Sequence, residues 1–135
     1  MIIDAEKYLQ EIIARALQTL GWPANAGEAR GHTEAIVINR PRQEGFGDFA
    51  TPIAMNLAKA LKKSPKILAQ ELTAALQYDD AVIDTITIDG PGFINFRLTP
   101  RYWQNTLAEI LKTRDTFGTS NWAHNQKINI EFVSA

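Results

Sequence analysis

The chain contains no cysteine and only two histidines among its 135 residues. Disulfide bonds, thiolate metal sites and a cysteine nucleophile are therefore excluded, and the composition suits a reducing cytoplasm. No apolar run approaches the roughly 20 residues that span a bilayer, and the first residues lack the basic and apolar blocks of a signal peptide. We therefore predict a soluble, cytoplasmic protein that has no membrane partner.

An excess of charge of one sign is also lacking, because the formal net charge is −1 at pH 7. Bulk positive charge cannot supply affinity for a polyanion, so any contact with nucleic acid must use a local patch. With 135 residues, of which 45% are hydrophobic and 21% charged, the chain can form one compact core but not two ordinary domains.

Signatures of catalysis are missing as well. Neither His32 nor His124 has the second histidine or the acidic residues that a metal site needs, so both are interpreted as exposed loop residues. The sequence has no Walker loop and no G-x-G-x-x-G motif. The glycines of Gly45-Phe46-Gly47-Asp48 could approach a phosphate, but a tight turn with Asp48 as a helix cap is the favoured interpretation.

Four helices are predicted from apolar residues at helical spacing and from their flanking residues. The first begins after the N-cap Asp4 and ends at Gly21. The other three begin at hydroxyl–proline pairs, in which the hydroxyl caps free N–H groups and proline fits the first turn. These pairs are Thr51-Pro52, Ser64-Pro65 and Thr99-Pro100. The apolar face of the fourth helix, expected to pack on the core, consists of Trp103, Leu107, Ile110 and Leu111.

Strands are predicted at residues 35–39, 82–89 and 93–98, and Gly90-Pro91-Gly92 should join the last two in a hairpin. Alternating apolar residues predict a further strand over residues 127–135, after a linker at 121–126. The predicted fold class is α/β (α+β), with helices packed on a small, mainly antiparallel sheet in the order α-β-α-α-β-β-α, followed by the terminal strand.

Residues 93–98 are the best candidate for a functional surface. Strand alternation places Phe93, Asn95 and Arg97 on one face, and the apolar residues between them on the other. An aromatic ring, an amide and a guanidinium displayed together can stack on, hydrogen-bond to and neutralise an unpaired nucleotide. An ordinary strand that faces solvent explains the same pattern equally well.

Three motifs in order along the chain resemble the bacterial arginyl-tRNA synthetases, which are class I aminoacyl-tRNA synthetases. They are Gly45 to Thr51 (GFGDFAT), Gly90 to Phe96 (GPGFINF) and Ile130 to Ala135 (IEFVSA). The resemblance implies that residues 1–120 are the additional N-terminal, tRNA-binding domain of that family. Residues 121–135 would then be a linker and the first strand of a truncated catalytic domain. The family's His-x-Gly-His signature is not present, which implies that this chain alone is not catalytic.

The resemblance also implies roles for individual residues. The family's additional domain contacts the D-loop at the outer corner of tRNA(Arg) with an aromatic residue and an asparagine, which match Phe93 and Asn95. We add Arg97 as a phosphate contact because it shares their face. In the intact enzyme, Glu131 would receive the guanidinium of substrate arginine and Ser134 would contact the same amino acid. From the strand pattern alone, Glu131 is an ordinary polar residue.

By the same resemblance, the intact enzyme would form arginyl-adenylate from arginine and ATP, with Mg²⁺, and would transfer arginine to tRNA. ATP and Mg²⁺ would serve the missing region, so no cofactor and no metal are expected in this chain. The alternative is a stand-alone α/β domain that senses a ligand or binds a protein. The apolar row of the terminal strand predicts that this strand pairs with the domain's own sheet or, as we favour, with a second copy of the chain.

Overall fold

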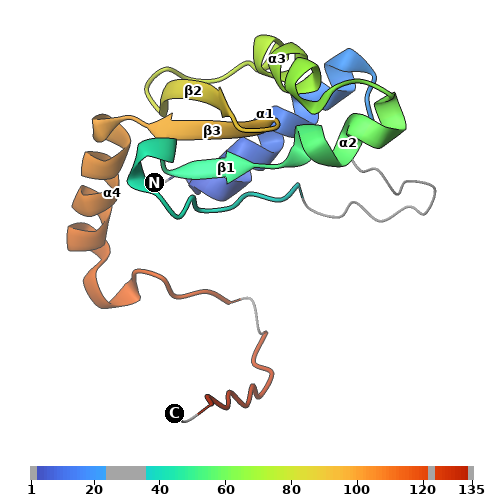
Figure 1. The fold of residues 1–135 in the computed structure, drawn as a ribbon. Coiled ribbons are helices and arrows are strands. Elements are labelled where there is room, and N and C mark those ends of the chain that lie inside the picture. Colours follow the sequence, from blue (N-terminus) through green and yellow to red (C-terminus); the bar gives the residue numbers. More distant parts are fainter. Residues whose placement is uncertain (1–2, 24–35, 122–123, 134–135) are drawn as a thin grey trace.

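The computed structural model describes residues 3–23, 36–121 and 124–133. Its elements are α1 (Ala5–Leu20), η1 (Glu44–Phe46), β1 (Phe49–Thr51), α2 (Ile53–Leu61), α3 (Pro65–Ala75), β2 (Ile83–Asp89), β3 (Phe93–Leu98), α4 (Pro100–Thr113) and η2 (Arg114–Thr116). Helices packed on a small antiparallel sheet confirm the predicted fold class (Figure 1). No helix in the described ranges is both long enough and apolar enough to cross a membrane.

The strand β3 lies at the centre of the sheet, whose order is β1-β3-β2, and both of its neighbours run antiparallel to it. The hairpin of β2 and β3 confirms that prediction. One face of β3 carries Ile94 and Phe96, which are fully buried in the core with the apolar faces of α1, α2 and α3. Phe93, Asn95 and Arg97 alternate with these residues and lie on the opposite face of the strand.

The first helix forms as its flanking residues predict. The side chain of Asp4 accepts a hydrogen bond from the Lys7 amide at 3.2 Å, so it is the N-cap of α1. Gly21 ends the helix in the left-handed conformation, with φ at 68°, and its amide donates to a carbonyl of the last turn. Between these caps, the apolar positions of α1 face the core.

The hydroxyl–proline pairs mark the helix starts, but their hydroxyls do not all act as expected. Thr99 caps α4 by accepting from the Tyr102 amide at 3.1 Å. Thr51 ends β1, and its hydroxyl donates to the Val37 carbonyl at 2.8 Å besides accepting from the first amide of α2 at 3.4 Å. Ser64 precedes α3 without any side-chain cap hydrogen bond, so that part of the prediction is wrong.

The first strand forms at residues 49–51 and not at the predicted residues 35–39. Residue 35 lies outside the described residues, and of residues 36–39 only Asn39 pairs with a strand, through two backbone hydrogen bonds to Ala50. The carbonyls of Ile36 and Val37 accept from side chains instead, those of Gln10 and Thr51. Because side chains satisfy these carbonyls, the segment follows β1 without forming a regular strand.

The helix α4 buries none of its residues, although its apolar face was expected to pack on the core. Trp103, Leu107 and Leu111 are all exposed. The physical reason is the direction of the helix, which leaves the end of β3 and projects away from the sheet (Figure 1). Tyr102, in its first turn, packs against the core and donates its hydroxyl to the Ile3 carbonyl at 2.9 Å.

The expected terminal strand is not formed in the described residues 124–133. Ile128, Ile130 and Phe132 are 54%, 68% and 85% exposed, and the segment lies away from the sheet (Figure 1). The prediction that it pairs with the domain's own sheet is therefore wrong. A strand requires a hydrogen-bonded neighbour, and alternation of side chains alone does not supply one. Pairing with a second copy stays a prediction.

The motif Gly45-Phe46-Gly47-Asp48 attaches the start of β1 to the central strand. The Asp48 amide donates to the Phe96 carbonyl at 2.8 Å, and the Asp48 carboxylate accepts from the Leu98 amide at 2.8 Å. Asp48 therefore binds β3 and does not cap α2, which corrects the sequence-based interpretation. Gly47 has φ at 87°, and a Cβ atom there would lie 2.7 Å from the Phe96 carbonyl oxygen. Only glycine, which has no Cβ atom, lets the backbone at this position come so close to β3.

We predict that Gly47→Ala lowers the free energy of unfolding by about 1–3 kcal/mol, because the methyl group strains φ and pushes the motif off β3. Urea denaturation followed by circular dichroism measures the loss. Gly45→Ala is the matched control, since that position has no atom within 4 Å of the added Cβ and no positive φ. Its free energy of unfolding should hold or rise by up to about 1 kcal/mol. Equal losses in both variants would contradict the role assigned to Gly47.

Candidate nucleic-acid interface

A hollow of about 680 Å³ lies on the face of the sheet opposite to the core. It combines residues that are far apart in the sequence: a loop before β1, part of β1, the turn of the hairpin and the start of β3. The lining residues are Asn39, Arg40, Pro41, Arg42, Gln43, Phe46, Ala50, Asp89, Gly90, Pro91, Phe93 and Asn95. A volume of this size is typical of small-ligand sites.

Asn95 lies at the base of the hollow, in the middle of the central strand. Its register partners are Ala50 on β1 and Thr87 on β2, so it is enclosed from both sides and is only 4% exposed. Its side-chain nitrogen Nδ2 donates to Asp89 Oδ2 at 2.7 Å. The Thr87 hydroxyl donates to the same carboxylate oxygen at 3.4 Å. The amide is therefore held in place before any ligand arrives.

Two aromatic side chains line the hollow and remain accessible. Phe93 is 38% exposed at the start of β3, and Phe46 is 39% exposed in η1. Aromatic faces of this kind stack on bases irrespective of base identity. The two rings come from separate elements, so the hollow offers a stacking surface on more than one of its walls.

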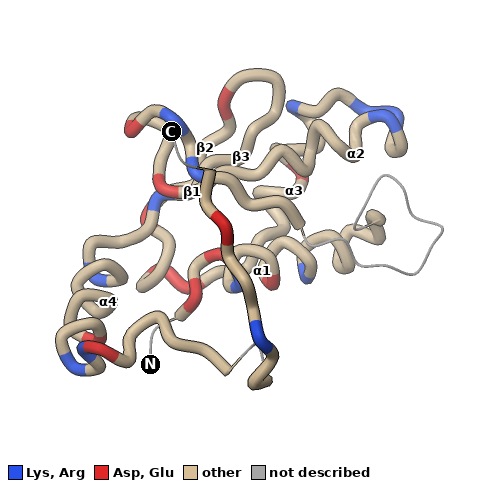
Figure 2. Tube along the Cα trace, turned by 90° about the horizontal axis from the view of Figure 1, so that it is seen from below, with Lys and Arg blue, Asp and Glu red and all other residues tan. Residues whose placement is uncertain are grey.

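The guanidinium groups of Arg40 and Arg42 give the hollow a local positive charge. Arg40 Cζ lies 5.8 Å from the centroid of the Phe49 ring, a cation–π contact at the edge of β1. Neither arginine forms an ion pair within the described part of the chain. Asp89 is the one acidic residue of the lining, against these two arginines. Elsewhere along the trace, basic and acidic residues are interspersed (Figure 2).

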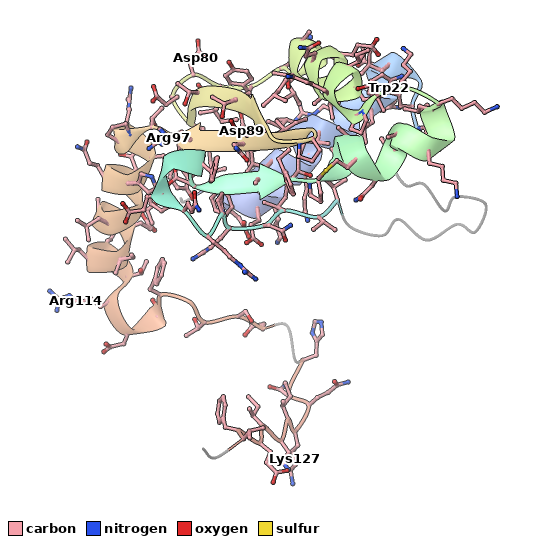
Figure 3. All side chains as sticks on the ribbon, in the orientation of Figure 1. Trp22, Asp80, Asp89, Arg97, Arg114 and Lys127 are labelled. Carbon is pink, nitrogen blue, oxygen red and sulfur yellow. The ribbon has the colours of Figure 1, made fainter. Side chains whose placement is uncertain are left out.

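The structure brings together two of the five residues singled out from the sequence. Phe93 and Asn95 line the hollow. Arg97 is exposed on β3, but it lies near the α4 end of the strand and does not line the hollow (Figure 3). Glu131 belongs to the exposed terminal segment and is not part of the hollow either. Ser134 lies outside the described residues.

Sequence reasoning missed Arg40, Arg42, Phe46 and Asp89. The two arginines beside Pro41 are a basic pair of the kind that a local patch requires, and they stand directly before the glycine motif. Asp89 is the hairpin partner of Phe93 in the observed register. Pairing the two predicted strands residue by residue would have indicated it.

The residues that line the hollow are suited to binding. Among residues 3–23, 36–121 and 124–133, no three His, Cys, Asp or Glu side chains are placed to hold a metal ion. His124 is exposed, as predicted, and His32 lies outside the described residues. Apart from the Asp89 carboxylate, the functional groups in the hollow are rings, amides and guanidinia, which recognise bases and phosphates.

Comparisons with known proteins agree with one another. The family model described as the arginyl tRNA synthetase N terminal domain matches residues 7–98. The arginine–tRNA ligase 1 of Halalkalibacterium halodurans is 41% identical over 100 residues, which are 74% of this chain and 18% of that protein. The arginine–tRNA ligase of Geotalea daltonii is 38% identical over 130 residues, which are 96% of this chain and 23% of that protein.

The comparison of folds also finds arginyl-tRNA synthetases. The solved structure of Thermus thermophilus arginyl-tRNA synthetase superposes with a TM-score of 0.57 at 28% sequence identity, covering 78% of this chain and 15% of that one. This chain thus spans about a fifth of the length of the curated relatives it matches.

Proposed function

Because this chain belongs to the arginyl-tRNA synthetase N-terminal domain family, we propose that its hollow binds an unpaired base of the D-loop, at the outer corner of tRNA(Arg). One observation carries the proposal: an accessible aromatic ring and an anchored asparagine line a single hollow together with two arginines. Each of these groups recognises a different part of a nucleotide.

The base would occupy the floor of the hollow. Phe93 supplies a face for stacking, and the Asn95 amide supplies hydrogen bonds to the edge of the base. Asn95 is almost fully buried, so a base must leave its own helical stack to reach it. This requirement favours an unpaired nucleotide in a loop over a base pair in a stem.

The phosphates of the nucleotide would lie beside Arg40 and Arg42, which form the basic rim of the hollow. Arg40 and Arg42 line the hollow and have no ion-pair partner among the described residues. Arg97 lies outside the hollow on the exposed side of β3, where it can contact the phosphate of a flanking nucleotide. Contacts of this kind position the RNA and do not read its sequence.

The intact protein, of which this chain is the N-terminal domain, would be a cytoplasmic arginine–tRNA ligase. It would form arginyl-adenylate from arginine and ATP, with Mg²⁺, and transfer the arginine to tRNA. This chain carries no His-x-Gly-His signature, so its own contribution would be to bind tRNA. Glu131 and Ser134 would contact substrate arginine once the rest of the catalytic domain is present.

We predict that Phe93→Ala and Asn95→Ala in the intact ligase raise the Kd for tRNA(Arg) and the KM for tRNA, and leave the KM for arginine unchanged. Loss of a stacked base costs about 1–3 kcal/mol of binding free energy. Fluorescence anisotropy with labelled tRNA(Arg) measures Kd. Phe117→Ala is the matched control, because Phe117 is also exposed but does not line the hollow. An equal rise in both KM values would point to misfolding and contradict the assignment.

We predict that Arg40→Ala and Arg42→Ala each make tRNA binding less dependent on salt. Removing one phosphate contact should lower the slope of log Kd against log salt by about 1, with little change in preference between tRNA sequences. Arg97→Ala should act in the same direction. Arg15→Ala, on the exposed face of α1 beside Glu11, is the control and should leave the slope unchanged. If Arg40→Ala, Arg42→Ala and Arg97→Ala all keep the wild-type slope, the proposed phosphate contacts of these arginines are wrong.

We predict that Glu131→Gln in the intact ligase raises the KM for arginine and leaves the Kd for tRNA(Arg) unchanged. The substitution removes one anionic acceptor from a charge-assisted hydrogen bond worth about 1.5–3 kcal/mol. Steady-state aminoacylation at varied arginine concentration measures the effect, and Glu6→Gln on α1 serves as the control. An unchanged arginine dependence would exclude Glu131 from the arginine site.

A further inference from the structure

Asp89 occupies a position that the proposed binding of a base does not by itself explain. It ends β2, opposite Phe93 in the hairpin, and it lines the hollow. Its Oδ2 accepts hydrogen bonds from Asn95 Nδ2 at 2.7 Å and from the Thr87 hydroxyl at 3.4 Å. It forms no ion pair with any described residue. A negative charge inside a site for a polyanion requires a reason.

The contact with Asp89 fixes which end of the Asn95 amide faces the ligand. A carboxylate oxygen only accepts hydrogen bonds, so the Nδ2 end must point toward Asp89 and the Oδ1 end must point away from it. Without such an anchor, a half-turn about the last side-chain bond would exchange the two ends, because that torsion has two nearly equivalent positions.

The oxygen of the Asn95 amide is left free for a ligand. No described donor reaches Oδ1, although the side chain is only 4% exposed. Thr73 Oγ1 is the one fully buried, unpartnered polar side-chain atom in the described part of the chain, and Asn95 Oδ1 is not such an atom. Asn95 lines the hollow, so an amide oxygen turned away from Asp89 can face a ligand bound there.

We propose that Asp89 is a positioning residue that holds the Asn95 carbonyl toward the hollow and thereby selects a base whose edge offers a hydrogen-bond donor. The amino groups of adenine and cytosine are such donors. Guanine O6 or uracil O4 at the same place would set two acceptors against each other, and the hydrogen bond would be lost. This inference rests on the proposed function, since it concerns the base bound in that hollow.

The test uses stem-loop RNAs that differ only in the amino group of the loop bases. One pair carries adenosine or purine riboside in the loop, and the other carries cytidine or its analogue without the 4-amino group. Fluorescence anisotropy gives the Kd of this chain for each RNA. In at least one pair, the wild type should bind the amino-bearing loop about threefold to tenfold more tightly, the effect of one hydrogen bond.

Asp89→Ala should reduce that ratio to about one, because the amide is then free to present either end. Phe93→Ala should weaken binding of both members of a pair equally and so preserve the ratio. Asp84→Ala is the matched control, since Asp84 lies exposed on the same strand outside the hollow. Asp89→Asn should retain part of the ratio, because its carbonyl can still accept from Nδ2.

A double-mutant cycle separates positioning from a general effect on the fold. In an Asn95→Ala background, Asp89→Ala should not change the ratio further, because the group through which it acts is gone. The side-chain amide signal of Asn95 in a ¹⁵N–¹H spectrum should also shift in Asp89→Ala while the backbone signals of α1 and α3 stay in place.

The outcomes distinguish this inference from the proposed function. If the wild type binds the loops, Phe93→Ala weakens binding and Asp89→Ala keeps the wild-type ratio, the positioning role is overturned and base binding stands. The positioning role is also overturned if Asp89→Ala changes the ratio in the Asn95→Ala background as much as it does in the wild type. If the wild type binds none of the RNAs, the proposed function fails and this inference fails with it.

Discussion

The pairing of β3 along both of its edges is the constraint on which the core and the candidate site depend. Because side chains alternate along a strand, one ladder places Ile94 and Phe96 in the core and Phe93 and Asn95 on the opposite face. A slip of one residue would exchange the two faces. The Asp48 contacts at the end of β3 oppose such a slip. The same interactions that stabilise the fold therefore fix the geometry of the site.

Close approaches of the backbone hold two walls of the hollow in place. On one side, Gly47 brings the arginine-bearing loop and η1 against β3, where any Cβ would meet the Phe96 carbonyl. On the other side, Gly92 lets the hairpin turn pack on Pro65 at the start of α3, where an added Cβ would lie 2.9 Å from the proline ring. Walls fixed before binding reduce the entropy lost when a ligand is ordered. Glycine in these motifs would thus contribute to the proposed recognition without touching the ligand.

Local sequence patterns predicted which helices and strands form. They predicted less well which of these elements lie against one another. Alternation and the glycine turn were sufficient for the β2–β3 hairpin and for the shared face of Phe93 and Asn95, because these relations are local. The place of Arg40 in the same hollow as Phe93 depends on β1 pairing with β3 across more than forty residues, which no local pattern encodes. The same limit applies to α4. This helix is amphipathic, but its apolar face has no partner in the described ranges. Periodicity specifies a face and leaves open what covers it.

The opposite charges in the hollow make different contacts, which explains how both could serve one ligand. Arg40 and Arg42 lie at the loop and attract a phosphate over distances up to the screening length, about 8–10 Å in physiological salt. The Asp89 carboxylate accepts hydrogen bonds from Asn95 and Thr87 and so orients these groups, while the two arginines outnumber it in the lining. An unpaired nucleotide has its charge on the phosphate and its identity on the base edge. In the proposed site, attraction by the loop would therefore be separate from selection of the base by Asn95 on the sheet.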